Sequence, residues 1–156
     1  MMRTALRDAL ANANVRAFLM AIRLGEGTSD ELGYYRIVGG GTFDDDSAHP
    51  NKRVYIERYD CNSSAAGAYQ IINKTWRAVQ KQYGFEDFSP ECQDEAAVAL
   101  IIGRHALDDV MAGRLATAVA KCSLEWASLP GSTAGQRVES FDKVEQVYLN
   151  SGGSLS

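Results

Sequence analysis

The apolar run from Ala96 to Ile102 limits the folds open to this chain more than any other segment. Ser89 followed by Pro90 is a strong helix-start signal, because serine caps a first turn and proline fits its first position. Residues 90–103 are therefore predicted to form one helix. Because this helix is apolar on nearly every side, we expect it to be buried at the centre of the domain.

Helical periodicity recurs on both sides of this segment. An apolar stripe predicts one helix over residues 3–24, and it consists of Leu6, Leu10, Ala17, Phe18, Ala21 and Ile22. Further helices are predicted over residues 64–84, 106–112 and 114–127, and from residue 138 onward. Residues 28–62 are rich in glycine and aspartate, with β-favouring pieces at 37–38 and 54–56 that predict a small irregular sheet of two or three strands. The fold class is α+β, in one domain over residues 1–156.

Glu26 is the first candidate for chemistry, because it stands between Gly25 and Gly27 where the N-terminal helix pattern ends. A carboxyl held on a rigid element, with glycines leaving room for a ligand, suits a general acid whose pKa is raised by an enclosed pocket. The alternative is that Gly25 caps the helix and Glu26 is an ordinary solvated residue.

The segment from Ser63 to Gln70 is the second candidate, and it is rich in small residues. Small residues permit close approach of a ligand. The Gln70 amide offers donors and an acceptor that can recognise sugar hydroxyl or acetamido groups. Together with Glu26, this segment predicts a sugar-binding cleft.

Composition excludes some classes of function. The formal net charge of -4 argues against sequence-independent nucleic-acid binding, which depends on clustered Lys and Arg. The same charge is unfavourable for an anionic cell-wall target, because long-range attraction would be weak or repulsive. The apolar run from Ala17 to Ile22 is too short for a signal peptide or a membrane span, so neither is expected.

Cysteines and histidines do not predict a metal site or a nucleophilic triad. Cys61, Cys92 and Cys122 lack metal-ligand spacing, and their odd number cannot form a closed disulfide set. We expect Cys92 and Cys122 to be buried and Cys61 to be exposed. His49 and His105 lie in unlike contexts without an orienting partner and are expected to be structural. No cofactor or metal is predicted.

A hydrolytic glycosidase needs a second carboxylate within about 5 to 9.5 Å of the first. Asp44, Asp45 and Asp46 are the candidates nearby in the sequence. Nothing in the sequence fixes which of them, if any, faces Glu26.

An ordered set of motifs resembles the lambda-type phage endolysin family, lytic transglycosylases with a lysozyme-like fold. The motifs run in the family's order over nearly the whole chain. They are Ala17 to Leu19, Gly25 to Thr28, Gly33-Tyr34, Ile37 to Gly40, Ser47, His49-Pro50, Ser64 to Gln70, Asp87 to Pro90, Gln93-Asp94, Cys122-Ser123 and Trp126 to Gly131.

The resemblance implies that Glu26 is the catalytic acid and base. It implies cleavage of the β-1,4 bond between N-acetylmuramic acid and N-acetylglucosamine in peptidoglycan, with formation of a 1,6-anhydro sugar. Loops around residues 41–62 and 128–137 would flank the glycan groove. Its substrate-binding residues would be Tyr34, Ser64, Tyr69, Gln70 and Gln136.

The resemblance also implies a biological setting. The protein would be a monomer made in the host bacterial cytoplasm, and it would reach the periplasm and cell wall after a holin-type membrane protein permeabilises the membrane. Two alternatives stay open: a hydrolytic lysozyme that uses water and one of the carboxylates at 44–46, or a non-catalytic glycan-binding module.

Overall fold

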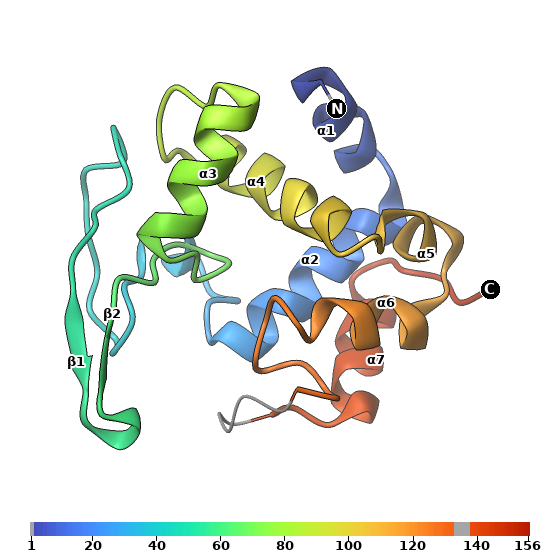
Figure 1. The fold of residues 1–156 in the computed structure, drawn as a ribbon. Helices are drawn as coiled ribbons and strands as arrows, with labels where there is room; N and C mark the ends of the chain where they lie inside the picture. Colours follow the sequence, from blue (N-terminus) through green and yellow to red (C-terminus); the bar gives the residue numbers. More distant parts are fainter. Residues whose placement is uncertain (1, 133–137) are drawn as a thin grey trace.

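The computed structural model describes residues 2–132 and 138–156 (Figure 1). The helices are α1 (Arg3–Leu10), α2 (Ala13–Glu26), α3 (Asn73–Tyr83), α4 (Pro90–Gly103), α5 (Leu107–Ala112), α6 (Leu115–Cys122) and α7 (Phe141–Asn150), with 3-10 turns η1 (Gly33–Tyr35) and η2 (Glu57–Tyr59) and strands β1 (Val54–Ile56) and β2 (Cys61–Ser63). The predicted α+β class is confirmed, since the chain is mostly helical with a small antiparallel sheet. Among the described residues, no helix combines the length and apolar character that crossing a membrane requires.

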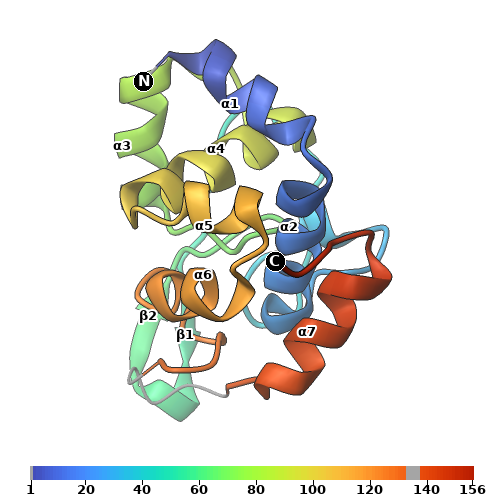
Figure 2. The same cartoon turned by 90° about the vertical axis from the view of Figure 1, so that its right-hand side faces the viewer.

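Helix α4 is the centre of the fold, as its apolar sequence predicts. It is buried continuously from Cys92 to Ile101 and packs against α1, α2, α3 and α5. Ser89 caps it, because its hydroxyl accepts a hydrogen bond from the Cys92 amide at 3.3 Å. Two perpendicular views show α4 crossing the interior of the molecule with α3 and α1 around it (Figure 1, Figure 2).

The single helix predicted over residues 3–24 is wrong, because the chain forms two helices there. Asn12 interrupts the pattern: its side-chain oxygen accepts from the amides of Asn14 at 2.9 Å and Val15 at 3.2 Å, so it caps α2. Helix α2 then continues to Glu26 and buries its apolar face against α7, α5, α4 and α1.

The helix predicted from residue 64 is also wrong over its first part, because α3 begins only at Asn73. Gly67 at φ +82° and Gln70 at φ +48° have left-handed backbones that interrupt a right-handed helix. Residues 66–71 instead form a tight turn in which Ala66 pairs with Ile71. The predicted end is confirmed, since Gly84 caps α3 in the left-handed conformation.

The sheet has two strands among the described residues. Val54 pairs with Ser63 and Ile56 with Cys61, so β1 and β2 form a short hairpin that stands beside the helices (Figure 1). The β-favouring piece at 37–38 contributes only a single bridge, from Ile37 to Ala66. The predicted exposure of Cys61 and burial of the other two cysteines are confirmed.

The C-terminal part is more strongly anchored than its sequence suggests. Helices α5 and α6 occupy the two predicted regions, although α6 already ends at Cys122. Residues after Asn150 lie beyond the last helix, where chain ends are often poorly ordered. Instead, the Ser154 amide donates to the Asn14 side chain at 2.9 Å and the Ser156 amide donates to the Gly113 carbonyl at 3.1 Å.

Gly67→Ala should lower the free energy of unfolding by at least about 1 kcal/mol, because an alanine there is strained at positive φ. Its Cβ would also collide with the Gln93 side chain. Gly103→Ala is the matched control, because a Cβ at Gly103 would meet no atom within 4 Å. Urea unfolding of both variants tests this, and equal stability of the two would contradict it.

Candidate active site

Glu26 is the last residue of α2, and the helix end fixes its backbone. The Gly27 amide donates to the Leu24 carbonyl at 3.2 Å, and the Thr28 amide donates to the Arg23 carbonyl at 3.0 Å. This paired pattern closes a helix around a left-handed glycine, here Gly27 at φ +72°. The helix cap is therefore Gly27 and not Gly25, and Glu26 is held on the helix.

Ser128 is the hydrogen-bond partner of Glu26. Its hydroxyl donates to the Glu26 Oε2 at 2.5 Å, and the serine is only 7% exposed. A Cβ at Gly25 would overlap the Ser128 side chain, so the glycine makes this contact possible. The space that Gly25 leaves open is thus occupied by Ser128 and not by a ligand.

The Glu26 carboxyl is partly buried, and this raises its pKa above the ordinary value of 4.5. Burial raises the pKa because the charged form loses hydration, while the hydrogen bond from Ser128 favours the charged form and partly opposes the rise. A carboxyl in this environment holds its proton to higher pH, as a general acid requires.

Thr28 joins the end of α2 to the 66–71 turn. Its buried hydroxyl donates a short hydrogen bond to the Ala68 carbonyl. Arg23 holds the following loop, because its guanidinium donates to the carbonyls of Thr28 at 2.9 Å and Asp30 at 3.0 Å and lies 4.6 Å from the centre of the Tyr34 ring. The two predicted regions, Glu26 and the segment ending at Gln70, are therefore adjacent.

Gln93 in α4 fixes the same turn from the interior. Its side-chain oxygen accepts from the Ala68 amide at 2.9 Å, and its side-chain nitrogen donates to the carbonyls of Tyr34 at 3.0 Å and Phe88 at 2.9 Å. One buried amide thus satisfies three separate backbone groups.

Asp94 hydrogen-bonds to two of the predicted groove residues, Tyr34 and Tyr69. Its Oδ1 accepts from the hydroxyls of Tyr69 at 2.6 Å and Tyr34 at 2.9 Å, and its Oδ2 pairs with Arg16 at 3.3 Å. Burial and the neighbouring carboxylate raise the pKa of Tyr34 to about 12. Tyr69 is 2% exposed, so its hydroxyl lies in the interior, while Tyr34 is partly buried.

The other two described groove candidates lie nearer the surface. Gln70 has a left-handed backbone, a sparsely populated conformation for this residue type that often marks functional sites. Its side-chain nitrogen donates to the carbonyls of Gly67 at 2.9 Å and Arg36 at 3.3 Å. Ser64 accepts a hydrogen bond from the Asn73 amide at 2.9 Å, so it caps the start of α3. Gln136 lies outside the described residues.

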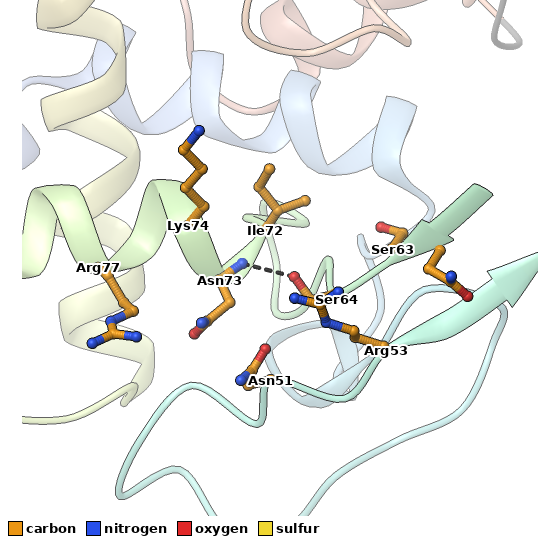
Figure 3. A pocket seen from close by; sticks show the side chains of 9 residues that line it. Asn51, Arg53, Ser63, Ser64, Ile72, Asn73, Lys74 and Arg77 are labelled. Carbon is orange, nitrogen blue, oxygen red and sulfur yellow. Dashed lines mark hydrogen bonds between the residues drawn. The ribbon is translucent and has the colours of Figure 1, made fainter.

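Two surface depressions lie beside this turn and share one lining residue. One, of about 510 Å³, lies between the base of the hairpin and the start of α3 (Figure 3). The other, of about 140 Å³, is lined by Gln70, Trp126 and neighbouring residues. Ile72, which is 44% exposed, lines both depressions. Trp126 lies two residues before Ser128 in the sequence. Its ring nitrogen donates a 3.0 Å hydrogen bond to the Tyr69 carbonyl.

Two of the three aspartates at 44–46 have hydrogen-bond partners other than Glu26. Asp46 accepts from the Tyr35 hydroxyl at 2.8 Å, and Asp45 accepts from the Ser47 amide at 2.9 Å. Among the described residues, no carboxylate hydrogen-bonds to Glu26 or shifts its pKa. The sequence left the choice among these three open, and the structure gives none of them a contact with the candidate acid.

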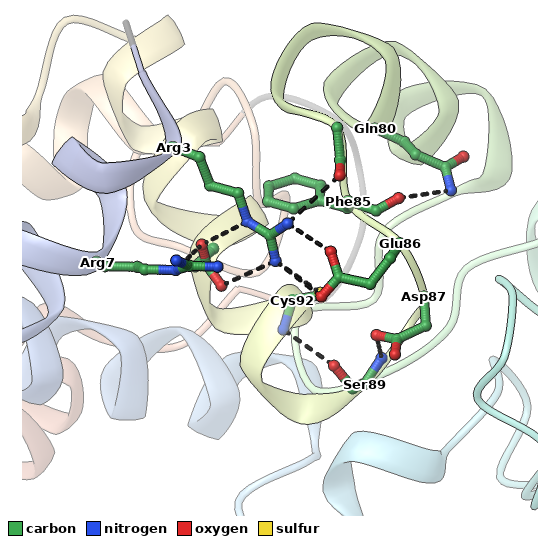
Figure 4. Close-up of polar contacts among 10 residues, drawn as sticks. Arg3, Arg7, Gln80, Phe85, Glu86, Asp87, Ser89 and Cys92 are labelled. Carbon is green, nitrogen blue, oxygen red and sulfur yellow. Dashed lines mark hydrogen bonds and ion pairs between the residues drawn. The ribbon is translucent and has the colours of Figure 1, made fainter.

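Within the described chain, the side chains that could bind a metal ion make hydrogen bonds or ion pairs with other residues. Glu86, Asp87 and Cys92 have ligand atoms close enough to share an ion. Arg3 already binds Glu86 and also donates to Cys92 at 3.3 Å, so a cation lies against this cluster (Figure 4). His49 is buried: its Nε2 donates to the Ile71 carbonyl at 2.8 Å and its Nδ1 accepts from the Asn51 amide at 2.9 Å, so its predicted structural role fits.

Sequence reasoning missed the two residues that control Glu26 most directly. Ser128 lies far away in the sequence, and the role of Gly25 appears only when that serine is placed against it. The pair Gln93-Asp94 carried a signal, because with Glu95 it forms a run of three polar residues in a helix that is otherwise mostly apolar and buried. Buried polar groups in such a helix require partners, which indicates a network.

Comparison with known structures shows that this protein has a lysozyme-like fold. Lambda lysozyme solved with a chitohexasaccharide superposes with a TM-score of 0.88 at 36% identity, over 93% of this chain and 97% of that one. A second structure of lysozyme from bacteriophage lambda gives a TM-score of 0.81 at 35% identity, with the same coverage of both chains.

The sequence places the chain more narrowly. The Endolysin family matches residues 16–155. The endolysin of Escherichia phage lambda is 37% identical over 92% of this chain and 94% of its own length, and that of Escherichia phage P2 is 39% identical over 90% and 93%. The chain belongs to the endolysin family, glycan-cleaving enzymes that degrade peptidoglycan.

Ser128→Ala should raise the pKa of Glu26 further, because it removes the hydrogen bond that favours the carboxylate while leaving burial in place. A pH titration of the Glu26 carboxyl carbon by NMR measures this directly. Ser47→Ala, in an exposed loop beside Asp45, is the control and should leave that titration unchanged. A lower or unaltered Glu26 pKa in Ser128→Ala would contradict this account.

Proposed function

We propose that this endolysin is a lytic transglycosylase that cleaves the β-1,4 bond between N-acetylmuramic acid and N-acetylglucosamine, with Glu26 as both acid and base. The observation that carries the proposal is the single carboxyl at the end of α2. It is partly buried, its pKa is raised, and one serine hydroxyl orients it.

The reaction needs one group that exchanges a proton twice. Protonated Glu26 gives its proton to the glycosidic oxygen as the bond from that oxygen to C1 of muramic acid breaks. The resulting carboxylate then takes the proton of the C6 hydroxyl, whose oxygen bonds to C1 and closes the 1,6-anhydro ring. Glu26 ends protonated, as it began, and no water is consumed.

Within the described chain, no carboxylate hydrogen-bonds to Glu26 or shifts its pKa, and this supports the transglycosylase chemistry over hydrolysis. An inverting or retaining hydrolase needs a partner acid at a defined distance. Asp45 and Asp46 accept hydrogen bonds from Ser47 and Tyr35, and within the described chain no acidic group perturbs the pKa of Glu26. An intramolecular hydroxyl nucleophile removes the need for such a partner.

For substrate binding, we infer a surface role for Ser64 and Gln70 and a positioning role for Tyr34 and Tyr69. The side-chain N–H groups of Gln70 donate to the carbonyls of Arg36 and Gly67, which leaves its side-chain oxygen as the acceptor for a donor such as a sugar hydroxyl. The tyrosines share the Asp94 carboxylate in the interior and hold the turn that carries Gln70. Gln136 stays a proposed contact.

The same proposal includes the route to the substrate. Made in the host cytoplasm as a monomer, the enzyme would reach peptidoglycan in the periplasm only after a holin-type membrane protein opens the membrane. The lambda homologue solved with a chitohexasaccharide supports binding of a β-1,4-linked glycan in this fold.

Glu26→Gln should lower the initial rate of peptidoglycan lysis at least about 100-fold, because general acid–base catalysis contributes on that order or more. Turbidity loss of purified peptidoglycan gives the rate. Undiminished lysis by the variant would remove Glu26 from the mechanism, and no lysis by either protein would favour a glycan-binding module.

Thermal unfolding shows that such a loss is not misfolding. Because burial raises the folded-state pKa of Glu26, the protonated group favours the fold at acidic pH, and this contribution is lost as pH rises through the folded-state pKa. At pH 7, Glu26→Gln should therefore be at least as stable as the wild type.

Mass spectrometry of the released fragments should find N-acetylmuramic acid in the 1,6-anhydro form. A hydrolase would add water and leave a reducing muramic acid that is heavier by one water molecule. Digestion in ¹⁸O-labelled water provides the internal check, because the transglycosylase product should carry no label. Labelled, reducing products would overturn the transglycosylase proposal while keeping a glycan-cleaving enzyme.

A further inference from the structure

The larger depression is lined by cations although the chain as a whole is acidic. Arg53 enters it from the residue before β1, and Lys74 and Arg77 enter it from the first turns of α3. The formal net charge of the chain is -4, yet no lining residue is acidic. A concentration of like charge around a concave surface attracts ligands of opposite charge.

These cations differ from most others in the chain because they have no carboxylate partner in the described structure. Most of the other arginines pair with an acidic side chain, including Arg3, Arg36, Arg104 and Arg114. No such pair involves Arg53, Lys74 or Arg77, and all three are exposed. They are available to an external anion.

The remaining polar lining of this depression suits a peptide. Asn51, Asn62 and Asn73 contribute side-chain amides, which can both donate to and accept from peptide groups. In the close-up, Arg53 extends from the hairpin toward the first turn of α3, and Arg77 lies one turn further along that helix (Figure 3). The two guanidinium groups thus come from opposite sides of the depression.

Its position relates it to Gln70, one of the proposed glycan contacts. Ile72 lines both this depression and the smaller one, which Gln70 and Trp126 also line. Trp126 precedes Ser128, the partner of Glu26, by two residues. A glycan that passes Gln70 on its way to Glu26 would therefore bring the groups attached to its sugars toward Arg53 and Arg77.

We propose that this depression binds the carboxylates of the peptide stems that peptidoglycan carries on muramic acid, with Arg53 and Arg77 as the main contacts. The inference rests on the proposed function, because it takes peptidoglycan as the substrate. It adds a second determinant of substrate specificity, because the enzyme would bind the charged carboxylates of the peptide stem as well as the sugars. Guanidinium groups suit this role because they bind carboxylates through two parallel hydrogen bonds.

The test compares two forms of one substrate. Native peptidoglycan is set beside the same material with its stem carboxylates converted to amides, which removes the charge and keeps both glycan and peptide. The enzymes are the wild type, the double variant Arg53→Gln/Arg77→Gln, and the control Lys81→Gln/Lys143→Gln. The control loses the same charge at two exposed lysines that do not line the depression.

On native peptidoglycan below saturation, the double variant should be about threefold to tenfold slower than the wild type, the range for two exposed charge pairs. On the amidated form, the wild type should fall to the rate of the double variant, and the substitutions should then have no further effect. The control should match the wild type on both substrates. Added salt should reduce the preference of the wild type for the native form.

Several outcomes would overturn the proposal. Equal slowing of the double variant on both substrates, or no slowing on either, would show that the arginines do not read stem charge. Binding of the wild type to anionic phospholipid vesicles that is lost in the double variant, with unchanged rates on native peptidoglycan, would assign the depression to membranes. If the wild type cleaves neither form, the proposed function itself fails.

Discussion

The site depends on two adjacent polar side chains, Gln93 and Asp94, in the most deeply buried helix of the fold. Gln93 binds backbone groups of three segments, and Asp94 binds two tyrosine hydroxyls and Arg16. In a low-dielectric interior, a polar group without a partner is costly, so each of these contacts fixes the segment it reaches. These contacts hold the 66–71 turn in place, although it lacks regular secondary structure.

The environment of Glu26 balances two opposing effects. Burial favours the proton-bearing carboxyl, and the Ser128 hydroxyl favours the carboxylate. A group that must both give and take a proton in one cycle benefits from such a balance, because a very high pKa would leave it a weak acid and a low one a weak base. Gly25 and Gly27 serve this arrangement separately: one admits the serine, and the other ends the helix so that Glu26 stays in place.

Short sequence patterns correctly predicted those elements whose formation depends on neighbouring residues. The Ser89-Pro90 start and apolar length of α4, the glycine that ends α3 and the strand at 54–56 all follow from patterns within a few residues. The break at Asn12 and the turn at 66–71 were missed because an apolar periodicity continues through both, while side-chain capping and left-handed backbones end the helices. Glu26 could be singled out from its flanking glycines. Ser128 could not, because only tertiary folding brings it to Glu26.

The net charge of this protein determines its electrostatic interactions at long range, whereas substrate binding depends on the charges within a few ångströms of the ligand. At physiological ionic strength, interactions between exposed charges are screened beyond about 8 Å. The acidic excess of the chain therefore has little effect on a ligand seated among Arg53, Lys74 and Arg77. Most of the other arginines are neutralised by their own acidic partners, whereas Arg53, Lys74 and Arg77 gather around one depression without an ion pair in the described structure. An acidic enzyme with this distribution can stay weakly attracted to anionic surfaces in general and still bind an anionic polymer at its site.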